Sequence, residues 1–173
     1  KVTRIKSAAV IGAGVIGSGW TARLLLNGID VDVFDPSDEA PQNVNKVIEN
    51  AERAYKKLLT LDLPQKGSLV FKNSVAEASK SADIIIEAVP ERLSAKQAVY
   101  KEIEHSAKNS AIIASSTSGI LPTELQAEMS SPDRLIVAHP FNPVYLLPLV
   151  ELVGGSRTSN ESIENAKRIF TEI

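Results

Sequence analysis

The sequence contains no cysteine and only two histidines. The absence of cysteine excludes disulfides, a thiolate nucleophile and a cysteine-based zinc site. Two histidines are too few for a histidine-rich metal site, so we expect no bound metal. No stretch approaches the roughly 18 uninterrupted apolar residues of a membrane-spanning helix. These absences remove thiol-based redox proteins, zinc proteins and transmembrane proteins from the possible classes.

An excess of charge of one sign is also missing, since 19 lysines and arginines face 21 aspartates and glutamates, for a formal net charge of -2. This balance offers no electrostatic basis for binding nucleic acid or an anionic membrane surface. The 173 residues are 43% hydrophobic and 23% charged, which is ordinary for a soluble globular domain. Glycines interrupt the apolar run near the N-terminus, which argues against a signal peptide. We therefore expect one cytoplasmic domain spanning residues 1–173, with no nucleic acid or membrane partner.

Short apolar runs alternate with helical patterns along the whole chain. The runs are rich in valine and isoleucine and lack polar residues at alternate positions, as in strands buried on both faces of a sheet. They lie at Ala8–Ile11, Val31–Phe34, Leu69–Phe71, Ile84–Val89, Ile112–Ala114, Leu135–Ala138 and Leu149–Val153. Ser94 with Gln97 and Thr158 with Glu161 are expected to cap two of the helices between them. The alternation predicts an α/β fold, a doubly wound and mostly parallel Rossmann sheet.

A glycine loop follows the first expected strand directly and opens the first helix, with the sequence Gly12-Ala13-Gly14-Val15-Ile16-Gly17. In a dinucleotide-binding loop, the first glycine permits a tight turn, the second lets the backbone approach the pyrophosphate, and the third allows close packing of the helix. The second strand ends at Asp35, near the place of the acid that binds an adenosine ribose, and no arginine follows closely. The loop predicts NAD rather than NADP as cofactor. The alternative is a glycine-rich turn that serves packing alone.

A second group of residues is His139-Pro140-Phe141-Asn142-Pro143, followed by Glu151 within an apolar strand. His139 is expected just beyond a strand, at the edge where open α/β sheets bind ligands. A buried carboxylate needs a partner, and the proline-rich turn can bring His139 beside Glu151. A carboxylate that holds an imidazole is suited to acid–base catalysis. A structural pair, or a glutamate exposed at the sheet edge, is an equally weighted alternative from the pattern alone.

Several other polar residues allow two interpretations. Ser115-Ser116-Thr117-Ser118 follows a strand and offers hydroxyls to a ligand, although serine-rich loops are commonly turns. Lys96 lies in the first turn of its helix, where a cation opposes the helix dipole, yet an ordinary surface lysine is the simpler interpretation. Glu91 has the same ambiguity, and Glu87 is explained as a charge at a strand end. His105 lies on a polar helix face and is expected to be solvated.

These motifs resemble the 3-hydroxyacyl-CoA dehydrogenase family, whose NAD-binding domain matches essentially the whole chain. The shared marks are the glycine loop, the Ser115–Ser118 segment, and His139-Pro140-Phe141-Asn142-Pro143 with Glu151 twelve residues after the histidine. Within the family, the chain is similar to the branch that acts on L-carnitine, in the segments Glu52–Tyr55, Val89–Leu93, Ser116–Pro122 and Asn142–Gly155.

The resemblance implies NAD-dependent oxidation of the 3-hydroxyl of L-carnitine, with His139 and Glu151 as the catalytic pair and Ser118 in contact with the substrate oxygen. It implies NAD contacts at Gly12, Ala13, Gly14, Val15, Ile16, Gly17, Asp35, Glu91, Lys96 and Ser116. A catalytic asparagine of the family belongs to a following helical domain, which we expect beyond residue 173 together with a homodimer interface. An aromatic wall is the usual device for binding a trimethylammonium group, and Phe141 and Tyr145 are candidates for it.

Two alternatives remain open. A 3-hydroxyacyl-CoA dehydrogenase would need a basic patch for the CoA phosphates, and the candidates for it look like a solvated helix face, at Lys46, Lys56, Lys57 and Lys66. A non-catalytic NAD(H)-binding module would need only the nucleotide site. The pairing of His139 with Glu151 argues against such a module, because cofactor binding alone does not require it.

Overall fold

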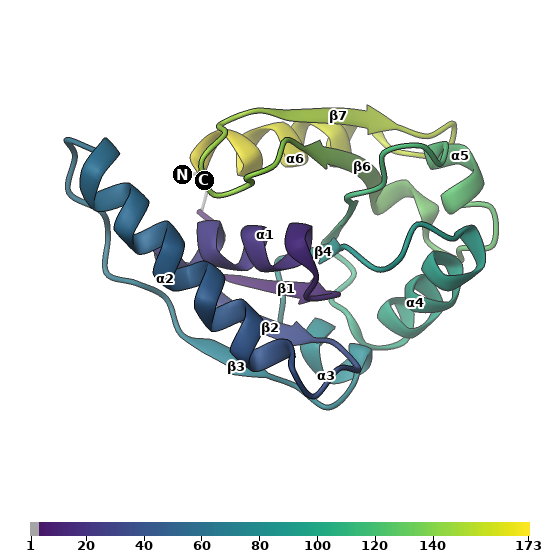
Figure 1. Ribbon diagram of the computed structural model, residues 1–173. Coiled ribbons are helices and arrows are strands. Elements are labelled where there is room, and N and C mark those ends of the chain that lie inside the picture. Colours follow the sequence, from purple (N-terminus) through teal and green to yellow (C-terminus); the bar gives the residue numbers. More distant parts are fainter. Residues whose placement is uncertain (1–3) are drawn as a thin grey trace.

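A computed structural model describes residues 4–173, and residues 1–3 of the expected domain lie outside the described part (Figure 1). One seven-stranded sheet has the order β3-β2-β1-β4-β5-β6-β7. The first six strands run parallel, and the last pairs antiparallel with β6. The strands are β1 Ser7–Ile11, β2 Asp30–Phe34, β3 Leu69–Phe71, β4 Ile84–Glu87, β5 Ile112–Ser115, β6 Leu135–Pro140 and β7 Val150–Gly154. The prediction of a doubly wound, mostly parallel sheet is confirmed.

Helices cover both faces of this sheet (Figure 1). One face carries α1 Val15–Leu26, α2 Ala40–Leu58 and α6 Asn160–Glu172, and the other carries α3 Val75–Ser79, α4 Leu93–Ser106 and α5 Pro122–Leu125. A 3-10 turn, η1 Pro132–Arg134, precedes β6. In β1, Ala8 and Val10 belong to the first hydrophobic core, whereas Ala9 and Ile11 belong to the second. This alternation explains why a continuous apolar run is needed: a central strand must supply both layers.

The last strand departs from the expected pattern. β7 lies at the edge of the sheet, and its residues alternate between half-buried and exposed rather than being buried on both faces. Val153 is 48% exposed, although it is one of the apolar residues that suggested a buried strand. β7 is antiparallel to β6, and an antiparallel strand can pack one face on the core while its other face reaches solvent. Glu151 is therefore not a buried carboxylate, and that part of the prediction is wrong.

Two expected helix caps are also wrong. α4 begins at Leu93, before Ser94, and the Gln97 amide donates to the Glu124 carbonyl at 3.1 Å instead of closing a capping box. The cap of α6 is Ser159, whose hydroxyl accepts the Ser162 amide at 3.0 Å. The Thr158 hydroxyl instead joins the Leu135 carbonyl at 2.7 Å. The side chains of Gln97 and Thr158 therefore bond to other parts of the fold instead of forming the caps that their spacing predicts.

Asp83 joins three segments at the amino end of the sheet. Its carboxylate accepts the backbone amides of Lys6 at 3.0 Å and Ser7 at 3.3 Å, and the Lys108 ammonium at 3.0 Å. Burial alone would raise the pKa of this carboxyl, but these donors outweigh it and hold the pKa below its ordinary value of 3.8. Its stabilising contribution is therefore complete above that ordinary value and is lost as the pH falls through the lowered one.

We expect Asp83→Asn to lower the free energy of unfolding at pH 7 by about 1–2 kcal/mol, because the amide keeps fewer and weaker acceptor bonds. Denaturant titrations of both proteins at several pH values measure the difference. The difference should shrink as the pH approaches 2, where the carboxyl is protonated too. A difference that stays constant between pH 7 and pH 2 would contradict this assignment.

The carboxyl ends of β1, β4, β5 and β6 lie side by side, at the end of the sheet opposite to Asp83, because these strands are parallel. We call this end the carboxyl edge. This edge is where open α/β sheets bind ligands.

In residues 4–173, no helix has the length and apolar character needed to cross a membrane. That same stretch holds no group of three histidine, cysteine, aspartate or glutamate side chains placed to bind a metal ion.

Candidate active site

A cavity of about 470 Å³ opens at this carboxyl edge. It is bounded by the glycine loop, the loop after β4, the loop after β5 and the end of β6. The residues that line it come from these four segments, from α4 and from the turn after β6, and they are Ile16, Ala88, Val89, Glu91, Lys96, Ser116, Ser118, His139, Pro140, Phe141 and Asn142. Most of the residues proposed from sequence for catalysis and for the nicotinamide end of NAD therefore lie around one space.

The three glycines of the loop differ in what surrounds them. Gly12 has φ +95°, and an added Cβ would lie 2.5 Å from the Ala88 carbonyl oxygen. A Cβ on Gly17 would lie 1.8 Å from the Gly12 carbonyl oxygen, so the close approach is to the loop itself. Gly14 has no protein atom within 4 Å of that position. The tight-turn and close-packing roles are thus confirmed, and Gly14 has the open side that a ligand approach requires.

The start of α1 suits an anionic ligand. Gly14 occupies the N-cap position, no side chain caps the helix, and the first turn contains no acidic residue. The backbone N–H groups of a first helical turn have no partners within the helix, so a pyrophosphate can accept them. Asp35, which follows β2, accepts the Ala13 amide at 2.7 Å and the Ser37 amide at 2.8 Å. The Asp35 carboxylate therefore holds the glycine loop in place.

His139 and Glu151 face each other across the β6–β7 ladder, in direct register. The His139 Nδ1 atom lies 3.1 Å from Glu151 Oε2, and the two side chains are 30% and 60% exposed. His139 lies within β6 rather than just beyond it, which corrects the expected position by one or two residues. The predicted pair exists, but strand register brings it together, not the need to neutralise a buried charge.

The two aromatic candidates lie in different places. The Phe141 ring is 5.5 Å from the His139 ring in an edge-on arrangement, and it lines the same cavity. Tyr145 instead packs against the core on the α1 and α2 side, and its carbonyl accepts the Tyr55 hydroxyl at 2.5 Å. Tyr145 therefore takes no part in this cavity, and Phe141 alone remains a candidate wall for a cationic group.

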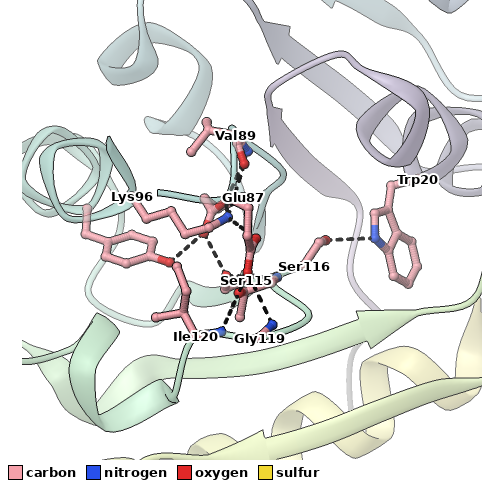
Figure 2. Close-up of polar contacts among 11 residues, drawn as sticks. Trp20, Glu87, Val89, Lys96, Ser115, Ser116, Gly119 and Ile120 are labelled. Atoms are coloured by element: carbon pink, nitrogen blue, oxygen red, sulfur yellow. Dashed lines mark hydrogen bonds and ion pairs between the residues drawn. The ribbon is translucent and has the colours of Figure 1, made fainter. Parts of the chain in front are cut away.

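The serine loop contributes both expected hydroxyls. Ser118 is exposed and borders the cavity together with His139. The Ser116 hydroxyl accepts the Trp20 indole N–H at 3.1 Å, which ties the loop to α1 (Figure 2). Ser116 is therefore fixed in orientation before any ligand binds, whereas Ser118 remains available to one.

Glu87 is the residue that sequence reasoning missed. Its carboxylate is fully buried and accepts four hydrogen bonds, two on each oxygen (Figure 2). Oε2 accepts the Lys96 ammonium at 2.7 Å and the Val89 amide at 3.0 Å, and Oε1 accepts the Tyr100 hydroxyl at 2.5 Å and the Ser115 hydroxyl at 2.7 Å. Burial, together with the charge of Glu87, raises the pKa of the Tyr100 hydroxyl well above its ordinary value of 10, so it stays a donor. The interpretation of Glu87 as a strand-end charge is wrong.

Lys96 is likewise not a surface lysine, because its side chain is only 1% exposed. Besides Glu87, its ammonium contacts the Val89 carbonyl at 3.1 Å and the Glu91 carboxylate at 3.5 Å. Glu91 also accepts the Thr117 hydroxyl and, at 3.2 Å, the Gly119 amide. These contacts clamp the loop after β4 to the loop after β5, the two loops that border the cavity. A lysine one turn into the helix after a strand-end glutamate was the available sequence signal.

The ionised form of Glu91 is favoured by its surroundings. Partial burial would raise the pKa of this carboxyl, but the hydrogen bonds from Thr117 and Gly119 and the charge of Lys96 together lower it below its ordinary value of 4.5. Glu91 therefore carries a negative charge at the cavity at neutral pH.

Comparison with known proteins places the chain in a family. Residues 7–173 match the family described as 3-hydroxyacyl-CoA dehydrogenase, NAD binding domain. An L-carnitine dehydrogenase from Mesorhizobium japonicum is 56% identical over 98% of this chain and 47% of its own length. An L-carnitine dehydrogenase/betainyl-CoA thioesterase from Rhizobium meliloti is 54% identical over 99% of this chain and 35% of its own length. The chain thus spans half or less of these two relatives.

Solved structures agree with this placement. A 5-formyl-3-hydroxy-2-methylpyridine 4-carboxylic acid 5-dehydrogenase, described as NAD+ dependent, superposes with a TM-score of 0.89 at 32% identity, over 97% of this chain and 55% of its own. An (S)-3-hydroxybutyryl-CoA dehydrogenase from Ralstonia eutropha gives a TM-score of 0.85 at 31% identity, over 97% of this chain and 60% of its own. With the glycine loop and the sheet order already described, these matches lead to one conclusion. The chain belongs to the 3-hydroxyacyl-CoA dehydrogenase family and forms its NAD-binding domain.

Proposed function

We propose that the full-length protein oxidises the 3-hydroxyl of L-carnitine to 3-dehydrocarnitine with NAD+ as the hydride acceptor. The observation that carries this proposal is the His139–Glu151 pair beside the cavity, since cofactor binding alone does not need it. The identity of 56% and 54% to proteins named for L-carnitine dehydrogenation supports this choice of substrate within the family.

His139 is the base in this proposal. With Nδ1 bonded to Glu151, Nε2 is the ring nitrogen left to take the hydroxyl proton of the substrate. Glu151 keeps the ring in that tautomer and stabilises the imidazolium that forms. Ser118 would donate a hydrogen bond to the substrate oxygen. NAD+, when bound, would supply the acceptor for the hydrogen at C3, which leaves as hydride.

The proposed cofactor contacts form two groups, one for the pyrophosphate and the adenosine ribose and one for the nicotinamide. The helix start at Gly12–Gly17, with Ala13, Gly14, Val15 and Ile16, would hold the pyrophosphate, and Asp35 the adenosine ribose. Ser116 and Glu91 border the cavity where the nicotinamide must lie to reach a carbon beside His139. Lys96 would mainly support the site from beneath the cavity rather than bind the cofactor directly, because its ammonium is already held by oxygens of Glu87, Val89 and Glu91.

Phe141 is the proposed contact for the trimethylammonium group of carnitine. A quaternary ammonium is attracted to the face of an aromatic ring and cannot be bound by hydrogen bonds. The Phe141 ring borders the same cavity as His139, and the centroids of the two rings are 5.5 Å apart, a separation that a small substrate can span.

We propose that a helical domain after residue 173 completes the substrate site and carries a homodimer interface in a cytoplasmic enzyme. The greater length of the relatives supports such a domain.

A CoA ester is a weaker candidate substrate. Lys46, Lys56 and Lys57 lie exposed on α2, and Lys66 pairs with Glu52 at 2.7 Å. None of these four lysines borders the cavity that holds His139. A solvated helix face explains the three lysines of α2, and Lys66, which lies in the loop after α2, is explained by its ion pair with Glu52.

The test is NADH formation by the full-length protein with L-carnitine, D-carnitine and 3-hydroxybutyryl-CoA in parallel, followed by absorbance. We expect NADH with L-carnitine and little with the other two. NADH from the CoA ester alone would overturn the substrate assignment. NADH from none of them, in a protein that binds NAD(H), would leave the non-catalytic module.

A further inference from the structure

The buried network beneath the cavity has an unbalanced charge. One ammonium, that of Lys96, lies between two carboxylates, at 2.7 Å from Glu87 and 3.5 Å from Glu91. Glu87 is saturated by four donors and completely buried, so its charge is matched by the close Lys96 contact. The group as a whole retains one negative charge.

That charge is located on the cavity side of the network. Glu91 borders the cavity and its side chain is 45% exposed, whereas Glu87 and Lys96 are exposed by 0% and 1%. The cavity wall also includes Lys96, whose ammonium is held within the network, and His139. The carboxylate that partners His139 is 60% exposed, so water screens it more than it screens Glu91.

The two redox forms of NAD differ in charge at one place. The nicotinamide ring is a cation in NAD+ and neutral in NADH, while the pyrophosphate is the same in both. A fixed negative charge in a partly desolvated cavity therefore stabilises the oxidised ring selectively. A contact that serves only as a hydrogen bond to ribose or amide would strengthen both forms alike.

We propose that the Glu87–Lys96–Glu91 network sets the relative affinity for NAD+ and NADH by presenting one net negative charge to the nicotinamide. The inference rests on the proposed function for the position of the ring beside His139. Glu87 is a positioning residue here: it touches no ligand, and it controls the charge that Lys96 leaves uncompensated on Glu91.

Two variants distinguish an effect of the network's charge from the loss of a contact with the cofactor, and two further variants serve as controls. Glu91→Gln removes the cavity charge and keeps a side chain of the same size. Glu87→Gln changes nothing on the cavity wall, but leaves Lys96 with Glu91 as its remaining anionic partner, so the network becomes neutral. Thr117→Val removes a hydrogen bond to Glu91 without removing its charge. Glu128→Gln, at an exposed ion pair with Lys101, is the matched control for charge loss elsewhere.

The experiment measures the dissociation constants of NADH by fluorescence and of NAD+ by calorimetry, on the full-length protein without substrate. We expect the ratio Kd(NADH)/Kd(NAD+) to fall about tenfold in Glu91→Gln and about threefold in Glu87→Gln, from the Coulomb attraction of unit charges at intermediate dielectric. Thr117→Val and Glu128→Gln should keep the wild-type ratio.

Equal weakening of both forms in Glu91→Gln, or an unchanged ratio, would overturn the inference. If Glu87→Gln does not fold, the Glu91→Gln ratio still decides. The readout is independent of the substrate assignment: an enzyme inactive on L-carnitine could still show the shift, and an active one could lack it.

Discussion

Replacing His139 by glutamine should lower turnover of L-carnitine by about 10²–10⁴-fold, the usual contribution of a general base. The amide keeps a polar group of similar reach beside Glu151 but has no nitrogen that accepts a proton. Because none of the glycine-loop contacts involves His139, NADH affinity should change by less than about twofold. Steady-state kinetics and NADH fluorescence titration on the same preparation measure both quantities.

The second histidine of the chain provides the matched control. His105 lies exposed on α4, with Nδ1 at 2.6 Å from the Lys101 carbonyl of its own helix. His105→Gln should therefore leave turnover and NADH binding unchanged. Full activity in His139→Gln, or an equal loss in His105→Gln, would remove His139 from the mechanism.

The glycine loop gives the second large effect. Gly17→Ala would place a Cβ 1.8 Å from the oxygen and 2.8 Å from the carbon of the Gly12 carbonyl. These are backbone atoms and cannot rotate away, so we expect the free energy of unfolding to fall by about 3 kcal/mol or more. NAD binding should weaken too, since the displaced carbonyl belongs to the loop that approaches the pyrophosphate. Denaturant unfolding and NADH titration report the two losses.

Gly14→Ala is the comparison that separates stability from binding. Its φ of -72° suits alanine, and no protein atom lies within 4 Å of the added Cβ. Stability should therefore stay within about 0.5 kcal/mol of the wild type. NAD affinity should nevertheless fall, because the methyl group occupies the side from which a pyrophosphate approaches. Unchanged affinity in Gly14→Ala would place the phosphates elsewhere.

Local sequence pattern was sufficient for the sheet and for the glycine loop. The apolar runs predict the positions of all seven strands, and the central strands are buried because each must fill two cores, as β1 does with adjacent residues. The edge strand β3 is only partly buried, with Val70 44% exposed. The edge position of β7 could not be read from its apolar sequence, because hydrophobicity does not say whether a strand has one neighbour or two. The same limit explains why Glu151 was expected to be buried.

The polar network could not be predicted for a related reason. Its bonds join residues far apart in the chain, such as Glu87 with Ser115 and Glu91 with Gly119. The periodicity of apolar residues carries no information on contacts between distant residues. On periodicity alone, Glu87 and Lys96 look like ordinary charges at the ends of a strand and a helix. The helix-dipole argument and the resemblance to the family both drew attention to Lys96, whereas Glu87 was interpreted as an ordinary charge at a strand end. Their burial side by side became visible only in the fold.

Isotope transfer tests the central claim most directly. L-carnitine carrying deuterium at C3 is incubated with the full-length protein and NAD+, and the NADH formed is examined by mass spectrometry. Hydride transfer from the carbon whose hydroxyl faces His139 predicts NADH that carries one deuterium per turnover. Unlabelled NADH, or the absence of NADH in a protein that binds NAD+, would contradict the oxidation of L-carnitine at this site.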